Sequence, residues 1–345
     1  MSDRLSHARQ PHKKRFETAD IQKSLAGPRN CLRVSMPPSV SAKHPILTLT
    51  GPTAVGKTEL SLAVADELNA EIVSVDSRQV YQELTIGTAK PSAAAREQVP
   101  HHFIGERSLH EPFSAGAYAD AANERIRGIL SRGRRPLVVG GATLYLHALQ
   151  YGLADIPDVE STVRERLEER LEAEGKQALY EELKDVDPKQ AADMDPTKTQ
   201  RVLRALEVYH GTGKPLSHYH EQQPEPPFDY VTVVLNRDRE RLYDRINRRV
   251  DRMLEEGLLD EVRAVMEMQD VRLDEPPLST IGYREPIRHL RKDLPYDEMV
   301  RLVKRNTRRY AKRQLTWFRR YDEYEWRKAP DTTPADLVSV LESAV

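Results

Sequence analysis

Eight consecutive residues match a pattern that binds phosphate groups in many proteins, G-x-x-x-x-G-K-[ST]. In such a loop the glycines let backbone N–H groups approach phosphate oxygens, and the start of the following helix adds a positive partial charge. The lysine contributes a point charge, and the last hydroxyl can ligate Mg²⁺. The residues of this predicted phosphate-binding loop are Gly51, Pro52, Thr53, Ala54, Val55, Gly56, Lys57 and Thr58.

The segments on either side of the loop have the properties that this pattern requires. Ile46–Thr50 is a short apolar run typical of a buried strand, and Glu59–Ala65 has the composition of a helix. A strand, the loop and a helix in this order are the context in which the pattern is specific. We therefore expect the loop to bind phosphate, although the loop alone leaves the phosphate compound open.

An acidic residue lies where it could act on a group held at the loop. Asp76 ends the second expected strand, Glu71–Asp76, and could accept a proton from an attacking nucleophile. An aspartate at a strand end often only caps a turn, and the residues alone leave both roles open. In ATPases and GTPases, an acidic residue at the end of a later strand helps to hold Mg²⁺. No carboxylate follows the third expected strand here, Pro136–Gly141.

The order of the expected elements indicates the α/β class. Strands rich in Val, Ile and Leu alternate with helices, which predicts a P-loop NTPase-like parallel sheet with helices on both faces. A charged helical stretch then interrupts the pattern, and the strand Tyr230–Leu235 resumes it. We expect a catalytic core of residues 45–156 and 228–330, an inserted all-helical unit of residues 157–227, a disordered basic arm of residues 1–44 and a C-terminal tail of residues 331–345.

Charge is nearly balanced over the chain but unevenly distributed along it. The sequence has 53 Lys and Arg against 54 Asp and Glu, while nine basic residues and no acidic one lie between Arg301 and Arg320. Such a run on a helix predicts a polyanionic partner. Arg245, Arg249 and Arg252 also share one helix face, although a solvent-exposed arginine stripe is the simpler interpretation of these three residues alone.

Several further features limit the class of protein. The single cysteine, Cys31, excludes an internal disulfide and a Cys-rich zinc module, and it favours the reducing cytoplasm. No apolar run approaches the ~20 residues needed to cross a bilayer, so we expect no membrane partner. The pair His101 and His102 could bind a metal, but two histidines without further ligands more often serve hydrogen bonding or packing. We expect a cytoplasmic monomer.

Beyond the phosphate-binding loop, an ordered series of motifs resembles one family, the tRNA dimethylallyltransferases of the bacterial type. The resemblance spans residues 45 to 326, and the series is far more specific than the loop alone. The matching segments are Val75–Tyr81, Ile86–Pro91, His101–His102, Gly140–Tyr145, Gln200–Glu207, Ile281–Arg284 and Arg308–Trp317.

The resemblance implies a reaction and a set of residue roles. In this family the loop binds dimethylallyl diphosphate and not ATP, and the dimethylallyl group passes to the exocyclic N6 amine of the adenosine at tRNA position 37, beside the anticodon, after that base has flipped into the enzyme. By resemblance, Thr53, Lys57 and Thr58 bind the diphosphate, with Mg²⁺ at Thr58. Asp76 corresponds to the general base, and Arg249 to an arginine that neutralises the leaving diphosphate.

The resemblance also implies contacts with the anticodon stem-loop of tRNA. The basic helix adds two further residues to this expected interface. Where the family commonly has threonine, this chain has Ala142, followed by Thr143. The expected tRNA-binding residues are Asp76, Ser77, Arg78, Gln79, Ala142, Arg164, Gln200, Arg201, Val202, Leu203, Arg204, Lys312 and Arg313.

Two other functions remain open on the residues alone. A small-molecule or nucleoside kinase would hold ATP at the loop and use Asp76 to deprotonate a hydroxyl, but it would not explain the basic helix or the helical insertion. A non-enzymatic RNA-binding protein with a vestigial nucleotide site would not need an intact Lys57-Thr58 pair together with Asp76. Thermal stabilisation by dimethylallyl diphosphate or by ATP would discriminate between the transferase and the kinase.

Overall fold

The computed structural model describes residues 45–274 and 276–344. The expected N-terminal arm of residues 1–44, which includes Cys31, lies outside the described residues.

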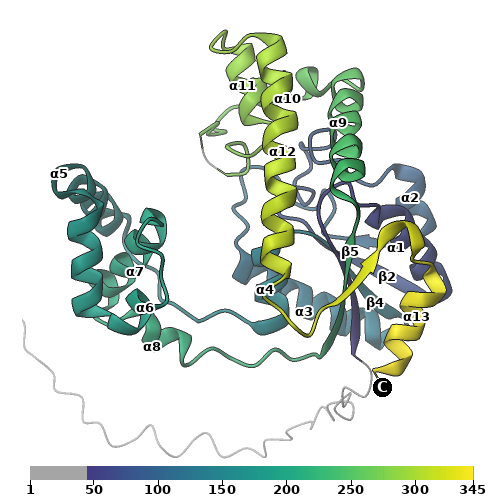
Figure 1. Cartoon of the computed structure of the whole chain (residues 1–345), viewed down its shortest axis with the longest axis horizontal. Helices are drawn as coiled ribbons and strands as arrows, with labels where there is room; N and C mark the ends of the chain where they lie inside the picture. The colour runs from purple at the N-terminus through teal and green to yellow at the C-terminus, as the bar shows by residue number, and fades with distance from the viewer. Residues whose placement is uncertain (1–44, 275, 345) are drawn as a thin grey trace, which may run out of the picture. The chain divides into compact units, whose positions relative to one another are not determined.

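The centre of the fold is a sheet of six parallel strands in the order β3-β2-β4-β1-β5-β6. Figure 1 labels β2, β4 and β5 of this sheet. The four longer strands lie where the apolar runs predicted them, within one residue at each end. The strands are β1 (Ile46–Thr50), β2 (Ala70–Val75), β3 (His101–His102), β4 (Arg135–Gly140), β5 (Tyr230–Asn236) and β6 (Glu325–Lys328). Because β1 lies between β4 and β5, the loop that follows β1 is placed in the middle of one edge of the sheet.

Helices cover both faces of the sheet, as expected for parallel strands. On one face, α3 (Ala115–Ser131) and α4 (Thr143–Tyr151) pack against Val73, Val75 and Val138. On the other face, α1 (Lys57–Glu67), α9 (Arg239–Glu255) and α13 (Pro334–Ser343) pack against alternate residues of the same strands, including Ile72 and Leu137. The alternation follows from strand geometry, in which successive side chains point to opposite faces.

The C-terminal segment that we expected to be a tail forms part of this core. Helix α13 buries Leu337 and Leu341 in the cluster that also contains residues of α1. A capping box begins the helix, because the Thr333 side chain accepts from the Asp336 amide and the Asp336 side chain accepts from the Thr333 amide. This signal was present in the sequence, together with a proline at the first helical position.

The helical insertion follows β4 and α4 and precedes β5. Its helices are α5 (Ser161–Val186), α6 (Pro188–Ala192), α7 (Thr199–Thr212) and α8 (Leu216–His220). They pack around an apolar cluster of their own, to which Leu167, Leu183 and Leu206 belong. The proposed limits of this unit, residues 157 and 227, stay a prediction.

Four helices remain, one before β5 in the chain and three after it. They are α2 (Ala93–Gln98), α10 (Leu258–Met266), α11 (Arg284–Leu290) and α12 (Tyr296–Phe318). Helices α10 and α11 pack mainly against other helices rather than against the sheet. Helix α12 runs beside α9, and Val250, Met299 and Val303 form a small cluster between them. None of the described helices is long and apolar enough to cross a membrane.

Candidate active site

The phosphate-binding loop connects β1 to α1 at the carboxyl edge of the sheet. Gly51 has a φ of +141°, and a Cβ there would lie 2.5 Å from the carbonyl oxygen of Leu235 on β5. Only glycine allows this close approach of two backbones. The loop borders a cavity of about 250 Å³, here called the phosphate cavity, together with Asp76, Gly140 and Arg249.

Lys57, the first residue of α1, points back over the loop. Its Nζ donates to the carbonyl oxygens of Gly51 at 2.9 Å and Pro52 at 3.0 Å. Burial, together with the positive charge of Arg249, lowers the pKa of Lys57 from 10.5 to about 7, and the negative charge of Asp76 partly opposes these two effects. Because burial makes the charged form of Lys57 costly, an anion bound beside Nζ would favour that form.

Arginines from α9 close the opposite side of the phosphate cavity. Arg249 Nη1 donates to Thr53 Oγ1 at 3.2 Å, and Arg245 Nε donates to the carbonyl oxygen of Ala54 at 2.8 Å. Burial and the charges of Arg245 and Arg252 lower the pKa of Arg249. The interpretation as a solvent-exposed stripe is therefore wrong for Arg245 and Arg249, which are partly buried against the loop, whereas Arg252 borders the same cavity and is exposed.

Asp76 follows β2 and forms a turn with the residues after it. Its Oδ1 accepts from the backbone amides of Arg78 at 2.8 Å and Gln79 at 3.1 Å. Because both amides meet the same oxygen, Oδ2 is left outside the turn. The two roles that the sequence left open for this carboxylate, a turn cap and a proton acceptor, are compatible.

A second cavity of about 250 Å³ meets the phosphate cavity at Asp76. Its walls come from the segments after β2 and β4, from α9 and α12, and from residues 280–283. The residues that border both cavities are Thr53, Asp76, Thr88, Arg249 and Tyr310. A compound held at the loop and a second compound held in the other cavity would therefore meet beside the Asp76 carboxylate.

Comparison with known proteins assigns this arrangement to a family. A family model described as IPP transferase matches residues 79–321. The chain is 78% identical over 304 residues to the tRNA dimethylallyltransferase of Salinibacter ruber. The matched region covers 88% of this chain and 94% of that relative. It is 46% identical over 288 residues to tRNA dimethylallyltransferase 1 of Pelobacter propionicus, which covers 83% of this chain and 93% of the relative.

The chain belongs to the IPP transferase family. The resemblance that the motifs indicated is thus confirmed, and with it the expectation of a transferase.

Solved structures of this family share the fold. A tRNA isopentenylpyrophosphate transferase from Bacillus halodurans matches with a TM-score of 0.64 and 39% identity, over 88% of this chain and 96% of that one. A eukaryotic dimethylallyltransferase acting on tRNA matches with a TM-score of 0.71 and 28% identity, over 83% of this chain and 74% of that one. The expected P-loop NTPase-like sheet is confirmed.

The tRNA-binding residues expected from the IPP transferase motifs separate into groups. Ser77, Arg78 and Ala142 border the second cavity, whereas Thr143 begins α4. Gln79 borders the phosphate cavity, and its Nε2 donates to the carbonyl oxygens of Thr88 at 3.1 Å and Ala89 at 3.2 Å.

Within the helical insertion, one surface group is brought together. Arg164 donates to the side-chain oxygen of Gln200, and it forms an ion pair with Glu207 at 3.5 Å. Arg201 and Arg204 are exposed on the same helix, α7. The expected contact is wrong for the side chains of Val202 and Leu203, which are 2% and 0% exposed in the apolar cluster of the insertion. Their side chains cannot reach an RNA, because the apolar face of α7 needs them.

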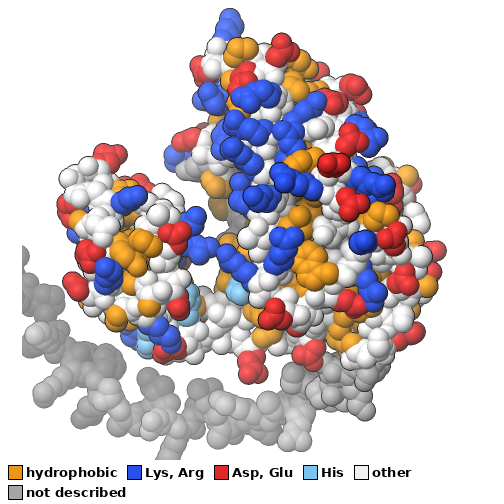
Figure 2. All heavy atoms as spheres, in the orientation of Figure 1, with side chains coloured by type: hydrophobic (Ala, Val, Ile, Leu, Met, Phe, Trp, Pro, Cys, Tyr) orange, Lys and Arg blue, Asp and Glu red, His pale blue; other side chains and the backbone are white. Residues whose placement is uncertain are grey.

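The basic run on α12 is only partly uncompensated. Arg301 pairs with Glu298 at 2.5 Å, and Lys304 pairs with Asp251 of α9 at 2.5 Å. Lys312 and Arg313 are exposed, and no ion pair joins either of them to an acidic residue within the described parts of the chain. Figure 2 shows Lys and Arg side chains gathered over the surface where α12 lies in Figure 1.

Sequence reasoning missed two residues of the site on α12. Gln314 is 3% exposed; its Oε1 accepts from the Thr53 amide at 3.0 Å, and its Nε2 donates to the Gly141 carbonyl oxygen at 2.7 Å. Tyr310, one turn earlier, borders both cavities. Both residues lie in the matched segment Arg308–Trp317, and their spacing of four places them on one helix face, a signal that could have identified them.

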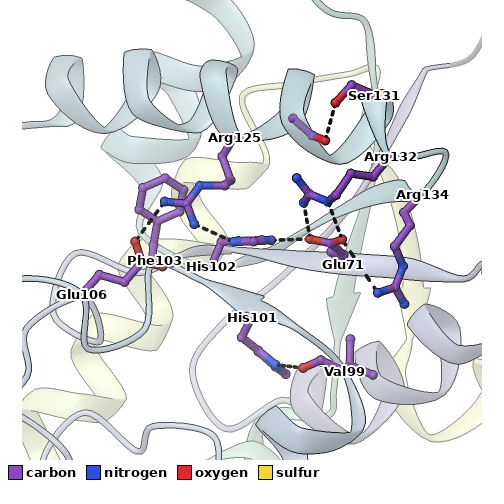
Figure 3. A network of polar contacts seen from close by, with 11 residues as sticks. Glu71, Val99, His101, His102, Phe103, Glu106, Arg125, Ser131, Arg132 and Arg134 are labelled. Atoms are coloured by element: carbon purple, nitrogen blue, oxygen red, sulfur yellow. Dashed lines mark hydrogen bonds and ion pairs between the residues drawn. The ribbon is translucent and has the colours of Figure 1, made fainter.

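The two histidines of β3 serve different sides of the sheet. His102 Nε2 lies 2.6 Å from the buried carboxylate of Glu71, which also pairs with Arg132 at 2.8 Å, as Figure 3 shows. His101 borders the phosphate cavity, and its Nδ1 lies 2.7 Å from the Val99 carbonyl oxygen. Both histidines hydrogen-bond, as predicted, and no group of metal-binding residues occurs in residues 45–274 and 276–344.

Proposed function

We propose that the chain transfers the dimethylallyl group of dimethylallyl diphosphate to the N6 amine of the adenosine at tRNA position 37, beside the anticodon. The two curated relatives described above are named tRNA dimethylallyltransferases, which supports this substrate pair. The observation that carries the proposal is the meeting of two cavities at Asp76, one of them bordered by a phosphate-binding loop. A two-substrate transfer needs such an arrangement, because both reactants must lie within reach of one base.

The diphosphate would bind in the phosphate cavity. Backbone amides of the loop, the N-terminus of α1, Lys57 and Arg249 converge there. As the bond between the allylic carbon and the diphosphate oxygen breaks, negative charge grows on that oxygen. These groups would stabilise the departing diphosphate more than the bound substrate, which is the condition for catalysis.

The residues present also fit a magnesium ion. Thr58 borders the phosphate cavity, and the described residues contain no cage of three or more His, Cys, Asp or Glu. Magnesium commonly binds through one or two protein oxygens, several waters and the phosphates of the substrate. Thr58 would hold the ion, which would add positive charge to the leaving diphosphate.

Asp76 would act as the general base. The lone pair of the adenosine N6 amine is delocalised into the ring, so attack on the allylic carbon benefits from a base that removes a proton. A new N–C bond would form, the C–O bond to diphosphate would break, and the amine proton would pass to Asp76. Because the turn uses Oδ1, Oδ2 is the oxygen available to receive this proton.

The direct test uses dimethylallyl diphosphate, Mg²⁺ and an anticodon stem-loop with adenosine at position 37, followed by mass analysis of the nucleosides. We expect isopentenyladenosine, and none when that adenosine is replaced by guanosine. A kinase would instead be stabilised in a thermal melt by ATP more than by dimethylallyl diphosphate, and it would leave the adenosine unmodified. That pair of results would overturn the proposal. A transferase that acts on tRNA would work in the cytoplasm.

A further inference from the structure

Glu261 on α10 belongs to none of the motifs, yet its carboxylate accepts four hydrogen bonds. Oε2 accepts from the backbone amides of Thr85 at 2.9 Å and Ile86 at 2.6 Å. Oε1 accepts from the Gly87 amide at 3.0 Å and from the Tyr283 hydroxyl at 2.7 Å. A carboxylate offers about four acceptor positions, so these donors use its full capacity.

Two of the four donors, Gly87 and Tyr283, line the second cavity, and the other two, Thr85 and Ile86, directly precede Gly87 in the chain. Gly87 and Thr88 form part of one wall, and residues 280–283 form part of the other. The walls also touch directly, because a Cβ on Gly87 would lie 2.5 Å from the Tyr283 ring. Glu261 is not among the residues that line the cavity, so any effect on a bound compound must pass through these walls.

The two walls depend on Glu261 to different degrees. The segment that contains Tyr283 has a second support, since the Gly282 amide donates to buried Glu285 at 3.0 Å, and Asn306 of α12 donates to the same carboxylate at 2.8 Å. Three successive amides of the segment 85–87, by contrast, all end on Glu261. That segment should therefore move first when the carboxylate is altered.

A short chain of hydrogen bonds continues from this segment to the turn that Asp76 forms with Arg78 and Gln79. Thr88 and Ala89, the next residues, accept from the side chain of Gln79 at 3.1 and 3.2 Å. The Gln79 amide in turn donates to Asp76 Oδ1 at 3.1 Å. Glu261 is thus linked to the Asp76 carboxylate through one loop and one side chain.

We propose that Glu261 is a positioning residue that fixes the shape of the second cavity and thereby controls acceptance of the nucleobase, without taking part in diphosphate binding. This inference rests on the proposed function, in which the second cavity receives the flipped adenosine. Replacing Glu261 with glutamine keeps the size of the side chain but turns one of its two acceptor oxygens into an NH₂ group, so the amides that donate to that oxygen lose their acceptor.

The test compares three variants with the wild-type chain: Glu261→Gln, Tyr283→Phe and Asp260→Asn. Asp260 is the matched control, because it lies next to Glu261 on α10 and loses the same charge, while its carboxylate is exposed and pairs with Arg263 at 2.6 Å. Steady-state kinetics are measured with each substrate varied in turn, and each variant is melted in parallel. Tyr283→Phe removes one of the four donors and leaves the amides in place.

For Glu261→Gln we expect the KM for the stem-loop to rise about tenfold or more, and the KM for dimethylallyl diphosphate to stay within about twofold. Tyr283→Phe should give a smaller rise of the same kind, and Asp260→Asn none. Equal rises for both substrates, or kinetic defects that follow a lowered melting temperature, would overturn the inference. If Glu261→Gln does not fold, Tyr283→Phe decides by the same criterion. An inactive wild-type chain would instead refute the proposed function.

Discussion

Binding of dimethylallyl diphosphate should take up a proton at and above neutral pH, because Lys57 must be charged to attract the diphosphate. Burial, followed by the charge of Arg249, lowers the pKa of Lys57 to about 7, so at that pH about half of the empty sites hold a neutral lysine. The diphosphate places negative charge beside Nζ and favours the protonated form. The pKa of Lys57 therefore rises on binding, and a proton is drawn from the solvent.

The size of the effect follows from that pKa. At about pH 8 roughly nine sites in ten are neutral before binding, so each binding event should take up about 0.9 proton, against about 0.5 proton at about pH 7. The apparent affinity should fall about tenfold between about pH 8 and about pH 9. Both pH values lie above the last phosphate ionisation, at about pH 6, so the ligand itself contributes little.

Titration calorimetry in two buffers with different ionisation enthalpies measures this uptake directly. The titration omits RNA, so that no group transfer takes place, and keeps Mg²⁺ constant. Lys57→Met serves as the control: it should bind more weakly and take up almost no proton at either pH. The reasoning is refuted if the wild-type chain takes up no proton at about pH 8, or if Lys57→Met takes up as much as the wild type.

Two further tests, one at Asp76 and one on α12, examine the division of roles in the site. Asp76→Asn should lower turnover by roughly 10²–10⁴-fold, measured by nucleoside analysis, with unchanged melting, because the asparagine oxygen can still accept the amides of the turn. Unchanged turnover would remove Asp76 from the mechanism. Joint replacement of Lys312 and Arg313 by alanine should flatten the slope of log stem-loop affinity against log salt by roughly one to two units. The same replacement of Arg301 and Lys304, which already pair with acidic residues, should change the slope less; equal changes would contradict a specific contact surface.

The parts of the site that the sequence predicted are those with local signals. The loop from Gly51 to Thr58 is a pattern of consecutive residues. The strands before and after it are apolar because they are buried, so each can be identified from its own sequence. The position of these residues at the carboxyl edge of the sheet then follows from the parallel pairing of the strands. That pairing brings Asp76 and Gly140 to the same edge as the loop.

The missed parts depend on contacts between residues far apart in the chain. Strand β3 has only two residues, too few for a periodic pattern, and it exists because it pairs with Ile72 and Val73. The spacing of Gln314 and Tyr310 places them on one face of a strongly basic helix, but the sequence does not say that this face is buried against the loop, 261 residues before Gln314. Glu261 is similar: an acidic residue on a short amphipathic helix is normally exposed, and only the folded chain brings three amides to it.

Asp76 shows why competing interpretations of one residue can both hold. An aspartate at a strand end can cap a turn or accept a proton, and these two roles do not exclude each other. A carboxylate has two oxygens, and the turn uses Oδ1 for the amides of Arg78 and Gln79. The same turn carries Ser77 and Arg78 into the wall of the second cavity. Capping therefore fixes the direction of the Asp76 side chain at the point where the two cavities meet. A general base needs such a fixed direction, with one oxygen left to accept the proton.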